Sequence, residues 1–144
     1  MAQLRPFAKE FGVTIELPDK IPYTKRALAI TEFARDMGKL ELFRDATMEA
    51  HWSQGKDIEA IEDLAEIASA VGLEPDEALS AGDDPAYLAR VDDIRKDAQS
   101  HQVTAIPTFM FGQHPVVGCQ RYETLERIAQ KLQIPEALSN RPSK

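Results

Sequence analysis

A short hairpin pattern that leads into a helix constrains this chain more than any other stretch. Within Val103–Cys119, the run Thr108–Phe111 is apolar and rich in aromatic residues, which is typical of a strand. Gly112 and Gln113 supply a two-residue turn, and His114–Val117 returns as a second short strand. Pro115 has no N–H, so we expect this second strand to lie at an edge or to pair on one side only. The stretch therefore predicts a β-hairpin with a proline, Pro107, just before its first strand.

The residues after the hairpin predict an amphipathic helix from Tyr122 to Leu132. Its apolar positions recur at helical spacing and define one face: Tyr122, Leu125, Ile128, Ala129 and Leu132.

Most of the chain before the hairpin has helical periodicity. We expect a short opening helix over 4–11, a half-buried strand at Val13–Leu17, and then a series of helices. These run from a Thr24 cap to Met37, over Leu40–Trp52, from an Asp57 cap to Gly72, over Pro75–Leu79, and from an Asp84 cap to about His101. The predicted core positions are Ala27, Ile30, Phe33, Ala34, Met37, Leu40, Phe43, Ala46, Ala50, Ile58, Ile61, Leu64, Ala65, Ala68, Tyr87, Leu88, Val91 and Ile94.

Length and charge limit the classes of function. A chain of 144 residues is typical of one domain. The net charge of −7 disfavours nucleic acid and anionic membranes as partners. No apolar run approaches the ~20 residues that span a bilayer, and the first residues lack the apolar core of a signal peptide. The single cysteine excludes an internal disulfide and fits a reducing compartment, so we expect a cytoplasmic protein.

Ala105–Phe109, the glycine turn, Val116–Gln120 and the following helix together resemble the C-terminal half of a thioredoxin fold. More narrowly, they resemble the DsbA family in its FrnE and 2-hydroxychromene-2-carboxylate isomerase branch. The resemblance implies an α/β, incomplete thioredoxin-like fold in a single domain. The thioredoxin-like parts would be 1–22 and 103–134, a DsbA-type all-helical insertion would cover 23–102, and 135–144 would be a frayed tail.

The resemblance also implies a substrate-binding loop. Pro107 would be the cis-proline that lies beside the active-site thiol in that family. Ile106, Pro107 and Thr108 would then hold an extended peptide, a thiol substrate or glutathione through their backbone groups. The lineage implied is thiol–disulfide oxidoreductase, with no resident cofactor other than glutathione as a candidate ligand.

The chain departs from that family because it has no Cys-x-x-Cys pair. The family's first strand and active-site helix start would precede Met1. One cysteine cannot complete a dithiol cycle, so we expect this chain to be weakly active or inactive. Without that central strand the sheet has two open edges, and we expect a homodimer to close them. The alternative is that Val13–Leu17 repacks or is not a strand.

Cys119 has two interpretations. Arg121 and a helix N-terminus would favour a reactive thiol, whereas a small, half-buried residue with a structural role is the interpretation that we favour. The three histidines have no ligand spacing, so no metal site is expected. We regard the carboxylates between Glu74 and Asp97 as a solvated face. Two other functions stay open: a glutathione-dependent isomerase or transferase, and a non-catalytic oligomeric binding or scaffold protein.

Overall fold

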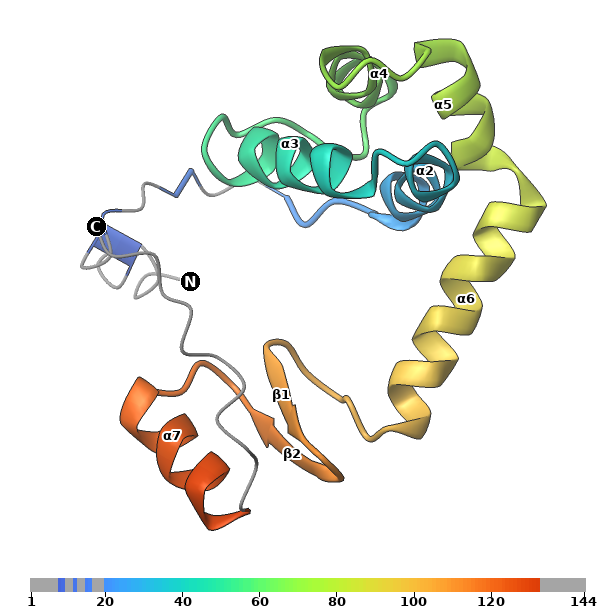
Figure 1. Ribbon diagram of the computed structural model, residues 1–144. Helices are drawn as coiled ribbons and strands as arrows, with labels where there is room; N and C mark the ends of the chain where they lie inside the picture. Colours follow the sequence, from blue (N-terminus) through green and yellow to red (C-terminus); the bar gives the residue numbers. More distant parts are fainter. Residues whose placement is uncertain (1–7, 10–11, 13–14, 17–19, 133–144) are drawn as a thin grey trace. The chain divides into compact units, whose positions relative to one another are not determined.

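The computed structural model describes residues 8–9, 12, 15–16 and 20–132. Its elements, in chain order, are α2 (Lys25–Asp36), α3 (Leu40–Trp52), α4 (Ile61–Ala70), α5 (Pro75–Asp83), α6 (Pro85–Ser100), β1 (Thr108–Phe111), β2 (His114–Val117) and α7 (Tyr122–Lys131) (Figure 1). The chain divides into two compact units, residues 1–94 and 95–144, and each is described by itself. The architecture is mixed α/β and rich in helix.

The first unit is a group of packed helices, in which α2 contacts α3 and α5, and α4 contacts α3 and α5 (Figure 1). Its largest fully buried side chains are those of Phe43, Ile30 and Leu64. They belong to one apolar cluster, which also contains Ala27, Ala34, Ala50, Ile58, Ile67, Ala68, Leu73 and Ala78. Burial of these side chains is the main stabilising contribution that the structure shows for this unit.

Close packing of α5 on α2 requires a small residue at position 82. A Cβ atom built on Gly82 would lie 2.7 Å from the Arg26 Cγ atom and 3.1 Å from the Ile30 Cγ1 atom. Because both distances are shorter than ordinary carbon contacts, glycine allows the two helices to approach.

The predicted helices are present with shifted ends. Helix α3 has the predicted bounds, whereas α5 extends to Asp83, beyond the predicted single turn. Helix α4 begins at Ile61, and Ala60 is its N-cap. Asp57 instead accepts a hydrogen bond from the Glu59 N–H, 3.0 Å away, in the turn that precedes the helix. Asp84 does cap α6, because its carboxylate accepts the Ala86 N–H at 2.7 Å.

Several predicted core positions are wrong. These are Met37, Ile61 and Ile94, which are exposed. Phe33 and Ala46 are half-buried and pack against the core cluster, as predicted. The other half-buried positions are Leu40, Ala65, Tyr87, Leu88 and Val91. Met37 is the residue after α2 ends, so it leaves the buried face of that helix, and Ile61 is the first residue of α4. The Thr24 side chain caps no N–H, although Thr24 occupies the N-cap position of α2.

The predicted strand at Val13–Leu17 is not seen at the two residues of it that the structure describes. Ile15 and Glu16 are in no strand, and the Glu16 N–H donates to the Trp52 carbonyl oxygen at 2.6 Å. At Glu16 the segment is therefore hydrogen-bonded to the end of α3, as expected if it is not a strand. Ala8 and Lys9 are helical. The rest of the predicted opening helix and strand, and the tail over 135–144, lie outside the described residues.

The second unit contains the hairpin, whose strands have the predicted bounds. The antiparallel pairs are Thr108 with Val117, Phe109 with Val116, Met110 with Pro115, and Phe111 with His114. Gly112 opens the turn at φ +61°, a conformation that glycine adopts without strain. Leu125, Ile128 and Ala129 are the half-buried apolar residues of α7, whereas Tyr122 and Leu132 are exposed, contrary to prediction.

Candidate functional site

The loop before the hairpin is positioned by the end of α6. Gln102 has φ +60°, a left-handed conformation that ends the helix. The Val103 N–H donates to the Ala98 carbonyl oxygen at 2.9 Å, and the Gln102 N–H donates to that of Gln99 at 3.0 Å. These bonds turn the chain at the end of α6, and residues 103–106 then line a hollow together with residues of that helix.

A hollow of about 540 Å³ lies between this loop and α6, entirely within the second unit. Three residues of α6 line it, and because they are three and four positions apart they share one side of the helix. The lining residues are Arg95, Ala98, Gln99, Val103, Thr104, Ala105 and Ile106.

Ile106 is the most exposed of the large apolar residues in the described part of the chain, with 91% of its surface accessible. Its N–H and C=O form no hydrogen bond with any described residue. An exposed donor and acceptor on one residue is what an extended peptide needs in order to bind through its backbone.

Pro107 and Thr108 hold this loop against the hairpin. The Ile106–Pro107 peptide bond is cis. The Pro107 carbonyl oxygen accepts the Gly118 N–H at 2.8 Å, and the Thr108 hydroxyl donates to the Ala105 carbonyl oxygen at 2.5 Å. The predicted binding residues Ile106, Pro107 and Thr108 therefore form one continuous loop and strand entry. Their role in binding a substrate stays a prediction.

The two edges of the hairpin differ in their hydrogen-bonding groups. Hydrogen-bonded and non-hydrogen-bonded pairs alternate along an antiparallel ladder. The bond from Gly118 to Pro107 makes the Thr108–Val117 and Met110–Pro115 pairs non-hydrogen-bonded, so their backbone groups point outward. Thr108 and Met110 thus present their backbone groups at the outer edge of β1, where no other described strand pairs. On the outer edge of β2, Pro115 has no N–H to offer.

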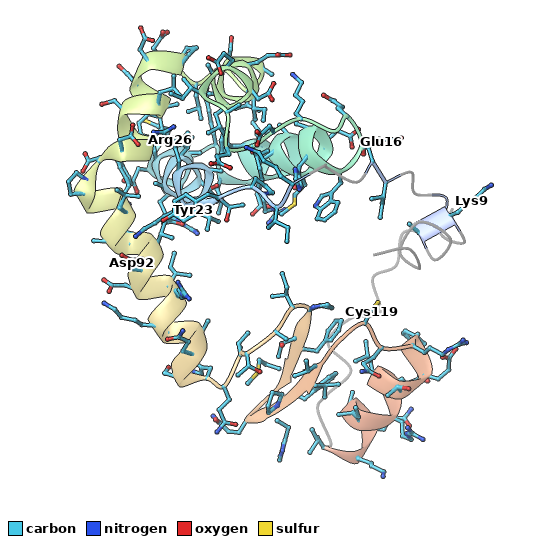
Figure 2. All side chains as sticks on the ribbon, turned by 180° about the vertical axis from the view of Figure 1, so that it is seen from behind. Lys9, Glu16, Tyr23, Arg26, Asp92 and Cys119 are labelled. Carbon is cyan, nitrogen blue, oxygen red and sulfur yellow. The ribbon has the colours of Figure 1, made fainter. Side chains whose placement is uncertain are left out.

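Cys119 follows Gly118 directly, just beyond the end of β2 (Figure 2). Because Gly118 is hydrogen-bonded to Pro107, the next residue, Cys119, lies near the loop. The thiol is free and exposed, so the half-buried interpretation favoured from the sequence is wrong. The sequence holds no second cysteine with which it could form an internal disulfide.

A second hollow, of about 420 Å³, lies in the helical unit around Tyr23, Lys25 and Arg26. Both of its cations are already paired. The Lys25 Nζ atom lies 3.0 Å from Asp92, and Arg26 forms two hydrogen bonds with Asp83, at 3.0 and 3.1 Å. This hollow therefore offers a ligand no unpaired charge, in contrast to the one beside Ile106.

The electrostatics of the helical unit are dominated by surface ion pairs. The pKa of Asp36 lies below its usual range, first because Arg90 donates to it and then because the Tyr87 hydroxyl does so. Across the part of the chain that the structure describes, no cluster of three His, Cys, Asp or Glu side chains is placed to bind a metal. Nor does any helix among those residues have the length and apolarity to span a bilayer.

Comparison with known proteins identifies the family of the chain. The family model described as a DSBA-like thioredoxin domain matches residues 1–130, and the chain belongs to that family. The chain is also 27% identical over 131 residues to the uncharacterized protein YwbO of Bacillus subtilis (strain 168). That match covers 86% of this chain and 64% of YwbO, so the chain spans somewhat less than two thirds of the relative's length.

The lining residues of α6 were missed from the sequence. Arg95, Ala98 and Gln99 carry a signal in their spacing, because positions three and four apart share a helix face. That spacing shows which residues share a side, but not which side faces the returning loop.

Proposed function

We propose that this chain is the substrate-holding part of a thiol–disulfide oxidoreductase of the DsbA lineage, and that Ile106, Pro107 and Thr108 bind an extended peptide. The observation that carries the proposal is the unpartnered, exposed backbone of Ile106 beside the open edge of β1. The family to which the chain belongs supports the lineage.

A peptide would bind by adding a strand along β1. The N–H and C=O groups of Ile106 are bonded to no described residue, and those of Thr108 and Met110 point away from β2, so alternate residues of one edge present donors and acceptors. Backbone bonds of this kind provide affinity with little dependence on the peptide's sequence. The hollow beside Ile106 would receive a side chain of the bound peptide.

Thiol–disulfide exchange needs more thiol groups than this chain holds. When a thiolate attacks a disulfide, one S–S bond forms and one thiolate leaves; a second thiol must then release the mixed disulfide. Cys119 supplies at most one of these thiols. We therefore propose that the chain by itself has little or no turnover in insulin reduction, and that its own contribution is to hold the substrate.

The test compares two substitutions at Met110. Met110→Pro removes an N–H that the register directs outward, at a position opposite Pro115 where no ladder bond is lost. Met110→Ala also removes the side chain but keeps the N–H, so the difference between the variants reports on the backbone donor. The probe is a fluorescent peptide of alternating Thr and Val with blocked ends, and binding is followed by anisotropy.

The proposal predicts that Met110→Ala binds the peptide nearly as well as the unsubstituted chain, and that Met110→Pro binds roughly five- to tenfold more weakly, as expected for one lost hydrogen bond. Retention of the amide NMR pattern of residues 108–117 controls for an intact hairpin. Equal binding by all three proteins would overturn the proposal.

Glutathione is a second candidate ligand. It is a short peptide with two carboxylates, and Arg95 in the hollow has no hydrogen bond or ion pair with any described residue. Calorimetric titration with reduced glutathione separates this candidate from the first. Binding of glutathione without binding of the Thr and Val peptide would favour a glutathione-dependent isomerase or transferase.

The same open edge supports the proposal of a homodimer, in which β1 of one chain pairs with that of a second copy. Sedimentation velocity tests it. A dimer that Met110→Pro converts to monomer would show that a second copy occupies the edge, and would favour the scaffold function over peptide binding.

A further inference from the structure

We propose that Arg95 gives the peptide site a preference for acidic segments, by pairing with an Asp or Glu side chain of the bound peptide. This inference rests on the proposed function, because it names the class of peptide that the same site takes. It depends on the contacts within residues 95–132 and on the sequence charge of residues 95–144, the second unit.

The Arg95 guanidinium is available to a ligand. Arg95 is one of the residues that line the hollow beside Ile106, and no described residue hydrogen-bonds to its guanidinium or forms an ion pair with it. Other arginines of the chain contrast with it: Arg26 is held by Asp83, Arg90 by Asp36, and Arg35 by Glu32. A planar guanidinium with free donors matches a carboxylate in a two-bond geometry.

The carboxylate nearest to Arg95 along α6 towards the loop does not compete for it. Asp97 is two positions further on, so it lies on a different side of the helix. Its Oδ1 atom lies 3.6 Å from the His101 Nδ1 atom. The described residues that share the hollow with Arg95 are uncharged, so none of them is a counter-ion for its positive charge.

The charge of the whole unit acts in the same direction. Residues 95–144 contain seven Lys and Arg against four Asp and Glu, whereas residues 1–94 contain ten against twenty. The whole chain has a net charge of −7, but the unit that contains the loop is basic. Complementary charge favours acidic partners and raises their association rate at low salt.

The proposed path of the peptide along β1 also indicates which of its side chains Arg95 would contact. An extended peptide bound along β1 places alternate side chains on one face, about 6 to 7 Å apart. A side chain that enters the hollow would lie among the α6 residues that line it, Arg95, Ala98 and Gln99. One acidic residue in the peptide would thus occupy the hollow, while its backbone keeps the bonds to Ile106 and Thr108.

The test uses a set of blocked Thr and Val peptides, each with one Thr replaced by Glu, together with matched peptides that carry Gln. Binding to the full chain is measured by anisotropy at 20 and 300 mM salt. We expect one Glu position to bind about two- to fivefold more tightly than its Gln partner at low salt, as for an exposed ion pair, and the advantage to shrink at high salt.

Three variants assign that preference. Arg95→Gln should abolish the Glu advantage, so that each Glu peptide and its Gln partner bind with equal affinity. Arg95→Glu should reverse it in favour of a Lys peptide. Arg127→Gln is the matched control, because it removes one exposed positive charge of the same unit from α7, outside the hollow, and it should retain the advantage.

The outcomes separate this inference from the proposed function. If the Gln peptides bind in a manner that depends on the Met110 N–H but show no Glu advantage, the inference is overturned and the proposed function stands. If Arg127→Gln lowers the Glu advantage as much as Arg95→Gln does, the preference comes from diffuse charge and the Arg95 contact is overturned. If neither Gln nor Glu peptides bind, both proposals fail.

Discussion

The substitution Phe43→Ala measures how much one buried ring contributes to the helical unit. The Phe43 side chain, on α3, is fully buried and belongs to the apolar cluster. Its neighbour Leu42 is on the same helix but has 59% of its surface exposed. The two residues therefore give a matched pair of truncations in one helix, one inside the core and one outside it.

Truncating a buried phenylalanine to alanine loses its transfer free energy and leaves a cavity, at a cost of about 3–5 kcal/mol. A unit of 94 residues is stable by roughly 5–14 kcal/mol, so Phe43→Ala should remove a large part of that stability. Leu42→Ala should change the free energy of unfolding by about 0.5 kcal/mol or less.

Urea unfolding followed by the fluorescence of Trp52 is the assay. The chain contains one tryptophan, and it is the last residue of α3, so the signal reports on the helical unit. Equal losses of unfolding free energy for Phe43→Ala and Leu42→Ala would refute the assignment of the core.

Three further predictions concern the two units. Arg90 holds the pKa of Asp36 low, so the stabilising effect of the Asp36 carboxylate is complete above the ordinary aspartate pKa of about 3.9 and is lost as the pH falls through the lower folded value. Asp36→Asn should therefore flatten the decline of the urea midpoint at acidic pH. An unchanged decline would contradict this. Gly82→Ala should lower the free energy of unfolding by about 1 kcal/mol, because the crowding against Arg26 outweighs the helix propensity gained; a more stable variant would show that Arg26 moves aside. Cys119 is exposed, so iodoacetamide should alkylate it at nearly the same rate in buffer and in urea, and strong protection in buffer would contradict its position.

The hairpin and the helices were predictable because their signals are local. Phe109 and the glycine turn after Phe111 set the strand bounds, and apolar spacing set α3. The ends of helices were less predictable: Asp57 had the chemistry of a cap, but the helix begins four residues later at Ile61. A capping residue shows where a helix is able to start, and packing decides where it does.

The candidate site was predictable only in part. The resemblance implied the loop at Ile106 and Pro107, and the structure places both residues beside the free edge of β1. The hollow beside α6 depends on the left-handed conformation of Gln102. A glycine would have predicted this conformation, and the position holds a glutamine. Arg95 was therefore identified as a site residue only from the structure, because its availability to a ligand depends on the residues around it and not on its own identity.

The strand predicted at Val13–Leu17 shows the limit of local patterns. Alternation of apolar and polar residues is a weak signal over five positions, and the resemblance strengthened it. At Glu16 the backbone instead bonds to the end of α3. A strand needs a partner edge, and the sequence pattern alone does not supply one.

The central claim is that an extended peptide binds along Ile106 and β1. Amide NMR of the full chain, titrated with the Thr and Val peptide, tests it most directly. The account predicts that the largest shift changes fall on the amides of Ile106, Thr108 and Met110, while those of α2 to α5 stay unchanged. Shift changes confined to the helical unit, or none at all at saturating peptide, would contradict it.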